Sequence, residues 1–136
     1  MNNYAETELR EGTLFSKKYN DYYSSKKDAL SESTYVFLEK NNLIQRWLNL
    51  PENKDLFTIG EVGFGGGINF LNCCKKWLEL DLKNKRLAYF ATEKMPLKLD
   101  DMKILHGFYE SLNAASNQLL DTYPKLTEGF NLIELF

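Results

Sequence analysis

Apolar residues between positions 31 and 48 recur with the spacing of a helix. This stretch reads SESTYVFLEKNNLIQRWL. Apolar positions three and four residues apart are typical of an amphipathic helix with one buried face. Either Ser31 or Ser33 would cap this helix, and Pro51 breaks the pattern. The predicted buried stripe consists of Val36, Phe37, Ile44, Trp47 and Leu48.

Two later stretches have the composition of strands, and a helical pattern separates them. Residues 56–62 read LFTIGEV, which fits a buried strand, and residues 86–93 read RLAYFATE, which predicts a second one. Between them, INFLNCCKKWLELDL follows a run of glycines and predicts a helix that ends near Lys83 and Asn84. Its apolar residues at helical spacing are Leu71, Cys74, Leu78 and Leu82.

The rest of the chain predicts two more helices and a strand. Pro96 opens PLKLDDMKILHGFY, which predicts a helix with proline at or near its first turn. NAASNQLLDTY predicts a further helix that Pro124 stops, and FNLIELF, at positions 130–136, predicts a strand. Residues 1–30 are polar and lack a clean period, so we expect an arm or loop there with short strands at most.

The predicted elements alternate as strand, glycine turn, helix, strand, two helices and strand. This βαβ order predicts an α/β fold with a doubly wound, mainly parallel sheet. The 136 residues are 43% hydrophobic, which allows one domain with a real core. The net charge of -2 creates no overall attraction to nucleic acid or membrane. No apolar run could cross a bilayer and no signal pattern opens the chain, so we expect a cytoplasmic protein.

The cysteines and the single histidine do not predict a metal or catalytic site. Cys73 and Cys74 are adjacent, which favours a reducing compartment and a buried helix face over a disulfide. They lack a second pair at the spacing of metal ligands. His106 lies in an amphipathic stretch, which favours a histidine at a helix end or partly exposed over a catalytic base.

The glycine run is the strongest functional signal. Gly63-Phe64-Gly65-Gly66-Gly67 joins a predicted strand to a predicted helix. Glycines let backbone N–H groups approach a ligand, and the helix N-terminus adds partial positive charge. The pattern is G-x-G-x-G, since Ile68 stands where dinucleotide folds have glycine. It is typical of S-adenosylmethionine sites, although a merely structural tight turn explains it equally well.

Two acidic residues lie where such a ligand would bind. Glu93 ends the next predicted strand, and an acid there can accept hydrogen bonds from both ribose hydroxyls. The alternative is a surface glutamate paired with Lys94. Glu61 directly precedes the turn and would face the cofactor, or else be solvated or cap the helix. Together these features predict a nucleoside cofactor, either S-adenosylmethionine or, less well, NAD.

Four motifs in order resemble the methyltransferase domain of the MnmC family. They are GTLFSKKYNDYYSS, ALSESTYVFLEKNNL, GFGGGINFL and TEKMPL. The resemblance implies a Rossmann-like class I methyltransferase fold. It also implies S-adenosylmethionine-dependent N-methylation of 5-aminomethyl-2-thiouridine at the tRNA wobble position, with tRNA as the partner and no metal.

The resemblance also implies roles for individual residues. The glycine turn would wrap the methionine and ribose side of the cofactor, Glu93 would bind the ribose, and Lys94 and Pro96 would flank the adenine. Tyr23 and Tyr35 match aromatic positions of an arm that closes over the site. The sequence departs from the family pattern at Asn20, Tyr22 and Ser24. The implied cofactor-binding set is Gly63, Phe64, Gly65, Gly67, Asn69, Glu93, Lys94, Pro96, Glu61, Tyr23 and Tyr35.

The family's domain continues beyond the point that corresponds to Phe136. The continuation includes a D-G-F-x-P strand, whose Asp is the expected partner of the substrate amine, and later an FAD-dependent oxidase. Positions 1–136 would thus be the N-terminal part of one methyltransferase domain, with an arm at 1–30, a βαβ core at 31–136 and about three core strands. The catalytic residue stays unknown, and the open sheet edge would favour self-association or a partner chain. The alternative function is an inactive S-adenosylmethionine-binding fragment, or an interaction module that a partner completes.

Overall fold

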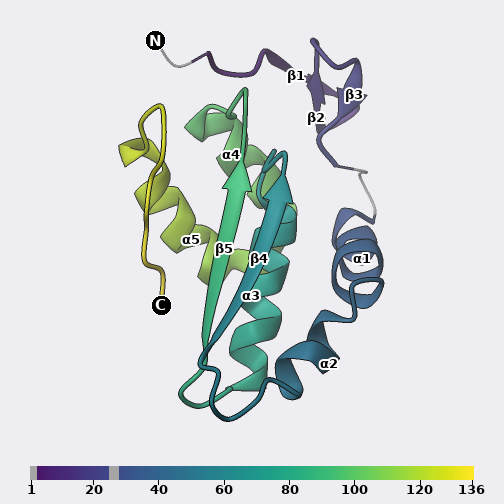
Figure 1. Ribbon diagram of the computed structural model, residues 1–136. Helices are drawn as coiled ribbons and strands as arrows, with labels where there is room; N and C mark the ends of the chain where they lie inside the picture. The colour runs from purple at the N-terminus through teal and green to yellow at the C-terminus, as the bar shows by residue number, and fades with distance from the viewer. Residues whose placement is uncertain (1–2, 25–27) are drawn as a thin grey trace.

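The computed structural model describes residues 3–24 and 28–136, and the arm at its start forms a small sheet (Figure 1). Strands β1 (Thr7–Arg10), β2 (Thr13–Ser16) and β3 (Asp21–Tyr22) pair antiparallel in that order. The amide N–H of Ala5 donates to the Pro96 carbonyl at 2.9 Å, which ties the arm to the loop after the second long strand. The prediction of short strands in this region is confirmed for its described residues.

The helix predicted over 31–48 is divided into three pieces: α1 (Ala29–Glu32), the π-helix η1 (Ser33–Glu39) and α2 (Leu43–Leu48). The break occurs at Asn42, whose backbone is left-handed with φ of 52°. The side-chain amide of Asn41 donates to the carbonyls of Val36 and Phe37 at 3.3 and 2.9 Å, which closes the preceding turn. A continuous helix here was therefore a wrong prediction.

The predicted cap and part of the predicted stripe were also wrong. The residue before α1 is Asp28, and neither Ser31 nor Ser33 caps it, since Ser33 accepts a hydrogen bond from Asn72 instead. Val36 and Leu48 are exposed, because the left-handed residue Asn42 ends the single helical register on which the stripe was predicted. The stripe is fully buried only at Trp47.

Two long parallel strands form the centre of the fold. β4 (Leu56–Val62) pairs with β5 (Arg86–Thr92) in a seven-residue register that ends at Val62 and Thr92. The crossover between them is α3 (Ile68–Leu80), which ends where Asp81 turns left-handed with φ of 46°. The predicted βαβ order is confirmed, and α3 ends three residues before the predicted Lys83.

Helices follow the second strand and cover α3. They are α4 (Leu99–His106), the 3₁₀ turn η2 (Glu110–Leu112), α5 (Asn113–Thr122) and the 3₁₀ turn η3 (Tyr123–Lys125). Pro96 precedes α4 by three residues, so proline lies near the first turn of this helix, as predicted, but not within it. The backbone before α4 is extended at Lys98, which explains the later start.

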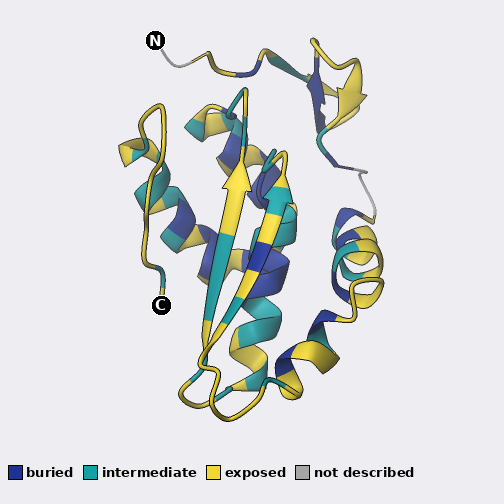
Figure 2. Ribbon diagram, viewed as in Figure 1, coloured by how far each residue is buried: buried dark blue, intermediate teal, exposed yellow. Residues whose placement is uncertain are grey.

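Two apolar cores flank α3. The first joins α3 to α4 and α5 through Leu71, Met102 and Leu119, all buried. The second joins α3 to η1, α2 and the sheet through Cys73, Trp47 and Ile59. Dark blue patches in Figure 2 mark these cores along the central helix. The cores therefore position the strand ends by fixing both sides of the crossover helix.

The sheet has one open face, which corrects two predictions. β4 was predicted as a buried strand, yet only Ile59 is buried, because helices cover one face alone and Val62 is 94% exposed (Figure 2). The segment 130–136 was predicted as a strand but has no strand pairing. Among the described residues β5 pairs with β4 only, so the segment 130–136 forms no backbone pairing with the sheet. Its Phe130 is 80% exposed.

Both cysteines are buried in α3, as the sequence predicted. Burial raises the pKa of Cys74 to about 12 and that of Cys73 still further, so neither is a thiolate at neutral pH. We expect neither thiol to react with a disulfide reagent at pH 7.5 until the protein unfolds, and both to react in denaturant. Rapid labelling of one equivalent in native buffer would contradict this prediction.

Candidate functional site

The glycine turn after β4 is tied to the end of β5. The N–H groups of Gly63 and Phe64 both donate to the carbonyl of Thr92 at 2.9 Å. The Gly67 N–H then donates to the Phe64 carbonyl at 2.9 Å, which closes a tight turn directly before α3. The turn is therefore fixed at the carboxyl end of the sheet, where ligands of parallel α/β folds bind.

The glycines of the turn fall into two groups. Gly66 and Gly67 are buried, and a Cβ at Gly66 would lie 2.0 Å from Leu105 while one at Gly67 would lie 2.6 Å from the Phe64 ring. A Cβ at Gly63 would meet no atom within 4 Å, and one at Gly65 would meet only Tyr23 at 4.0 Å. The first pair thus serves packing, and the second faces open space that a ligand could use.

Gly66 was absent from the predicted site residues, although the turn depends on it. Its backbone has no positive φ, so the conformational argument for glycine does not apply there. The requirement comes from Leu105, which lies far away in the sequence. Gly63, Gly65 and Gly67 do have positive φ, of 85°, 55° and 74°.

Glu93 closes over the turn from the end of the second strand. Its carboxylate accepts hydrogen bonds from the N–H of Gly65 and from the N–H of Met95, both at 2.8 Å. No ion pair joins it to Lys94 among the described residues, and its side chain is half-buried. The interpretation of Glu93 as a surface glutamate paired with Lys94 is therefore wrong.

Glu61 belongs to a polar cluster below the turn. Its carboxylate accepts from the Asn69 amide at 2.8 Å and from the Tyr89 hydroxyl at 2.7 Å. Burial, followed by the hydrogen bond to Glu61, raises the pKa of Tyr89, so this phenol remains a donor. Glu61 is thus held by two side chains and is neither freely solvated nor a helix cap.

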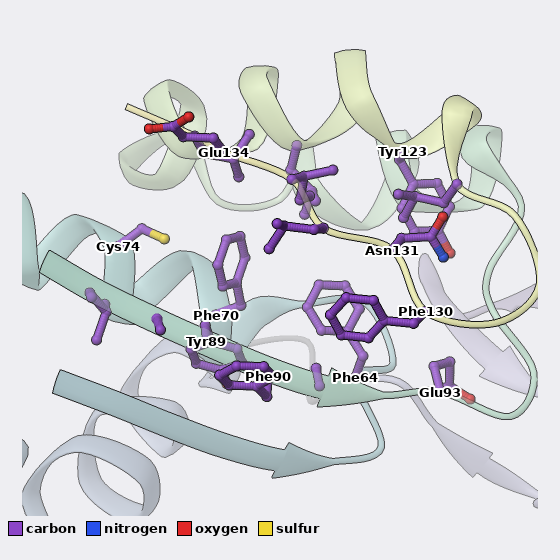
Figure 3. Close-up of a pocket in the computed structure, with 18 of the residues that line it drawn as sticks. Phe64, Phe70, Cys74, Tyr89, Phe90, Glu93, Tyr123, Phe130, Asn131 and Glu134 are labelled. Carbon is purple, nitrogen blue, oxygen red and sulfur yellow. The ribbon is translucent and has the colours of Figure 1, made fainter. Parts of the chain in front are cut away.

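Two hollows meet at the glycine turn. A groove of about 1030 Å³ runs between the sheet and the segment 126–136, and Figure 3 shows Phe70, Tyr89 and Phe90 on one wall and Phe130 on the other. A smaller hollow of about 290 Å³ lies between the turn, the arm and η1. Phe64 lines both hollows, so its ring stands at their junction.

Most of the predicted cofactor-binding residues lie around these hollows. The groove is lined by Phe64, Glu93, Lys94 and Pro96. The smaller hollow is lined by Gly63, Phe64, Gly65, Glu61, Asn69 and Tyr23. Tyr35 lies in neither hollow, is 53% exposed and packs its ring 4.8 Å from the Lys40 ammonium. Gly67 lines neither and instead makes room for Phe64.

His106 ends α4, as predicted for a helix-end histidine, but it is buried and not partly exposed. Its ring contacts the carbonyl of Gly66 and the hydroxyl of Ser116. Sequence reasoning missed this contact with the turn, because 40 residues separate the two partners. In the described part of the chain no three histidine, cysteine or acidic side chains form a group that could hold a metal ion, and no helix could cross a membrane.

Comparison with known proteins finds relatives of this chain among the MnmC proteins. The tRNA 5-methylaminomethyl-2-thiouridine biosynthesis bifunctional protein MnmC of Legionella pneumophila (strain Lens) is 39% identical over 128 residues, which cover 93% of this chain. The MnmC protein of Idiomarina loihiensis is 37% identical over 136 residues, which cover 99% of this chain. This chain is related to the MnmC proteins.

The relation extends to structure and covers a limited part of those proteins. The chain spans 19% of the length of the Legionella MnmC protein and 22% of that of the Idiomarina protein. A crystal structure of MnmC2 from Aquifex aeolicus superposes with a TM-score of 0.58 and 25% identity, covering 69% of this chain and 31% of that one. No family model matches the chain. The resemblance to MnmC is confirmed, and the α/β architecture agrees with that of MnmC2.

Proposed function

We propose that the chain binds S-adenosylmethionine at the glycine turn and is the cofactor-binding part of an MnmC-like tRNA methyltransferase. The observation that carries this proposal is the Glu93 carboxylate, which lies 2.8 Å from the Gly65 N–H at the junction of two hollows. An acid at the end of the second strand beside a glycine turn suits a ligand that has both a ribose and a charged tail.

The residues around the two hollows would contact different parts of S-adenosylmethionine. Glu93 would accept hydrogen bonds from the ribose hydroxyls, and Lys94 and Pro96 would border the adenine on the groove side. Gly63 and Gly65 leave space for the methionine part, close to Asn69 and Glu61. When bound, S-adenosylmethionine supplies an activated methyl group on a sulfonium. The chain's own contribution is to orient the ligand and to exclude water around it.

The acceptor follows from the relatives. MnmC proteins are named for 5-methylaminomethyl-2-thiouridine biosynthesis in tRNA, which supports an aminomethyl uridine of tRNA as substrate. The family resemblance of the sequence motifs implies that this uridine is the one at the wobble position. The residues 1–136 would form part of a single methyltransferase domain with an arm at 1–30, of which Tyr23 lines the smaller hollow. Methyl transfer from labelled cofactor to hypomodified tRNA separates an active enzyme from a fragment that only binds the cofactor.

The cofactor assignment is tested by calorimetric titration with S-adenosylmethionine and, separately, with NAD. We expect binding of S-adenosylmethionine and weaker or no binding of NAD. Gly65→Val should abolish detectable binding, because valine at φ of 55° is strained and its side chain would enter the smaller hollow.

The matched control is Gly60→Val in strand β4. Gly60 has no positive φ, and a Cβ there would meet no atom within 4 Å. This variant should keep the wild-type affinity for S-adenosylmethionine. A preference of the wild type for NAD, or equal affinities of Gly65→Val and the wild type, would refute the assignment.

A further inference from the structure

We infer that His106 is a positioning residue that holds the glycine turn in its ligand-binding conformation from the buried side of the turn. This inference rests on the proposed function, in which S-adenosylmethionine is the ligand of the turn. The Nε2 atom of His106 lies 2.8 Å from the Gly66 carbonyl oxygen, and its Nδ1 atom lies 2.8 Å from the Ser116 hydroxyl. The side chain is buried, at 3% exposure.

The partners of the ring fix its tautomer. A carbonyl oxygen can only accept a hydrogen bond, so Nε2 carries the proton and donates to Gly66. The Nδ1 lone pair then accepts from the Ser116 hydroxyl. Burial lowers the pKa of His106, which agrees with a neutral ring at pH 7. One N–H group therefore links the end of α4 to the middle of the glycine turn.

The hydrogen bond from His106 contacts the central residue of the glycine turn, Gly66. Gly66 stands between Gly65 and Gly67, both of which have positive φ. The N–H of Gly65 donates to a different partner, the carboxylate of Glu93. Fixing the Gly66 carbonyl on the buried side consequently fixes the orientation of the peptide groups on the ligand side.

A second contact supports the same assignment. Leu105, the neighbour of His106 on α4, occupies the space where a Cβ of Gly66 would be, at 2.0 Å. The end of α4 thus presses an apolar side chain and a hydrogen-bond donor against one buried glycine. Ser116 extends the support to α5, because its hydroxyl holds the far side of the ring.

The experiment compares three variants of the full chain. His106→Phe keeps a ring but removes both hydrogen bonds, and His106→Gln retains an N–H donor on a side chain of similar reach. Leu43→Ala is the matched control, because Leu43 is buried in the second core, which the turn does not join. Each variant is measured by calorimetric titration with S-adenosylmethionine, by amide hydrogen exchange of Gly65 and Gly67 without ligand, and by thermal unfolding.

We expect His106→Phe to lower the affinity about tenfold or more and to speed exchange of the two turn amides. His106→Gln should stay within about threefold of the wild type in affinity. Leu43→Ala should lower the unfolding temperature without changing affinity or exchange in the turn. This pattern separates positioning of the turn from a general loss of stability.

The inference is overturned if His106→Phe leaves exchange of the turn amides as slow as in the wild type, or if glutamine restores neither measurement. Hydrogen exchange needs no ligand, so it decides the role of His106 even if the wild type fails to bind S-adenosylmethionine. Failure of the wild type to bind would instead refute the proposed function.

Discussion

Replacing Glu93 by alanine should weaken S-adenosylmethionine binding about 100-fold, which corresponds to about 2.7 kcal/mol. The carboxylate has two tasks that one substitution removes together. It accepts from the Gly65 and Met95 N–H groups, which sets the distance between the turn and the end of β5. It would also accept hydrogen bonds from the ribose hydroxyls. A hydrogen bond to a charged group contributes about 1.5–3 kcal/mol, so the net loss of one such bond to the ribose accounts for the expected change.

Two controls accompany this titration. Glu93→Gln keeps one carbonyl acceptor for the turn but loses the charge, so we expect an intermediate affinity. Glu79→Gln removes a charge from the exposed side of α3, where Glu79 pairs with Lys75 and Lys76, and should leave affinity unchanged. Equal affinities of Glu93→Ala and the wild type would contradict the proposed role of this acid.

Trp47→Ala should lower the free energy of unfolding by about 3–5 kcal/mol. Trp47 is 1% exposed and packs edge-on against Trp77 and Phe57, with ring centroids 5.4 and 6.2 Å away. Removing the indole leaves a cavity between α2, α3 and β4. Since small domains have about 5–15 kcal/mol of stability in total, a large share of it would be lost. Urea unfolding followed by circular dichroism measures the change.

Trp47→Phe provides the matched comparison. The indole N–H of Trp47 is buried and has no hydrogen-bond partner in the described part of the chain. Phenylalanine retains most of the aromatic contact and removes this unsatisfied donor, which itself is unfavourable when buried. We expect a loss below about 2 kcal/mol. A loss as large as that of the alanine variant would contradict the absence of a hydrogen-bond partner for this N–H.

Local patterns were sufficient to predict the centre of the fold. α3, β4 and β5 were found because each has an uninterrupted period, and glycines separate the first strand from the helix. Burial of β4 was predicted wrongly, because it depends on what covers the outer face of the sheet. The break at Asn42 was missed because it depends on the side chain of Asn41, which bonds to earlier carbonyls. Helical spacing alone carries no sign of that competition.

The candidate site was predictable where topology decides it. Parallel pairing brings residues that follow β4 and β5 to one edge, so Glu93 and Gly65 could be placed together from their positions alone. The support behind the turn could not be found in this way. Leu105 and His106 reach Gly66 through tertiary packing of α4, and nothing in the local pattern of that helix indicates this contact.

The register of the two long strands links folding to ligand occupancy. Val62 faces Thr92 in the last rung of the ladder, and the turn and Glu93 begin immediately beyond it. A ligand that binds both the glycine turn and Glu93 would link the carboxyl ends of the two strands. By mass action its binding energy adds to the resistance of the whole βαβ unit to thermal melting. A higher cellular concentration of the proposed ligand, S-adenosylmethionine, would therefore raise the folded fraction of this chain.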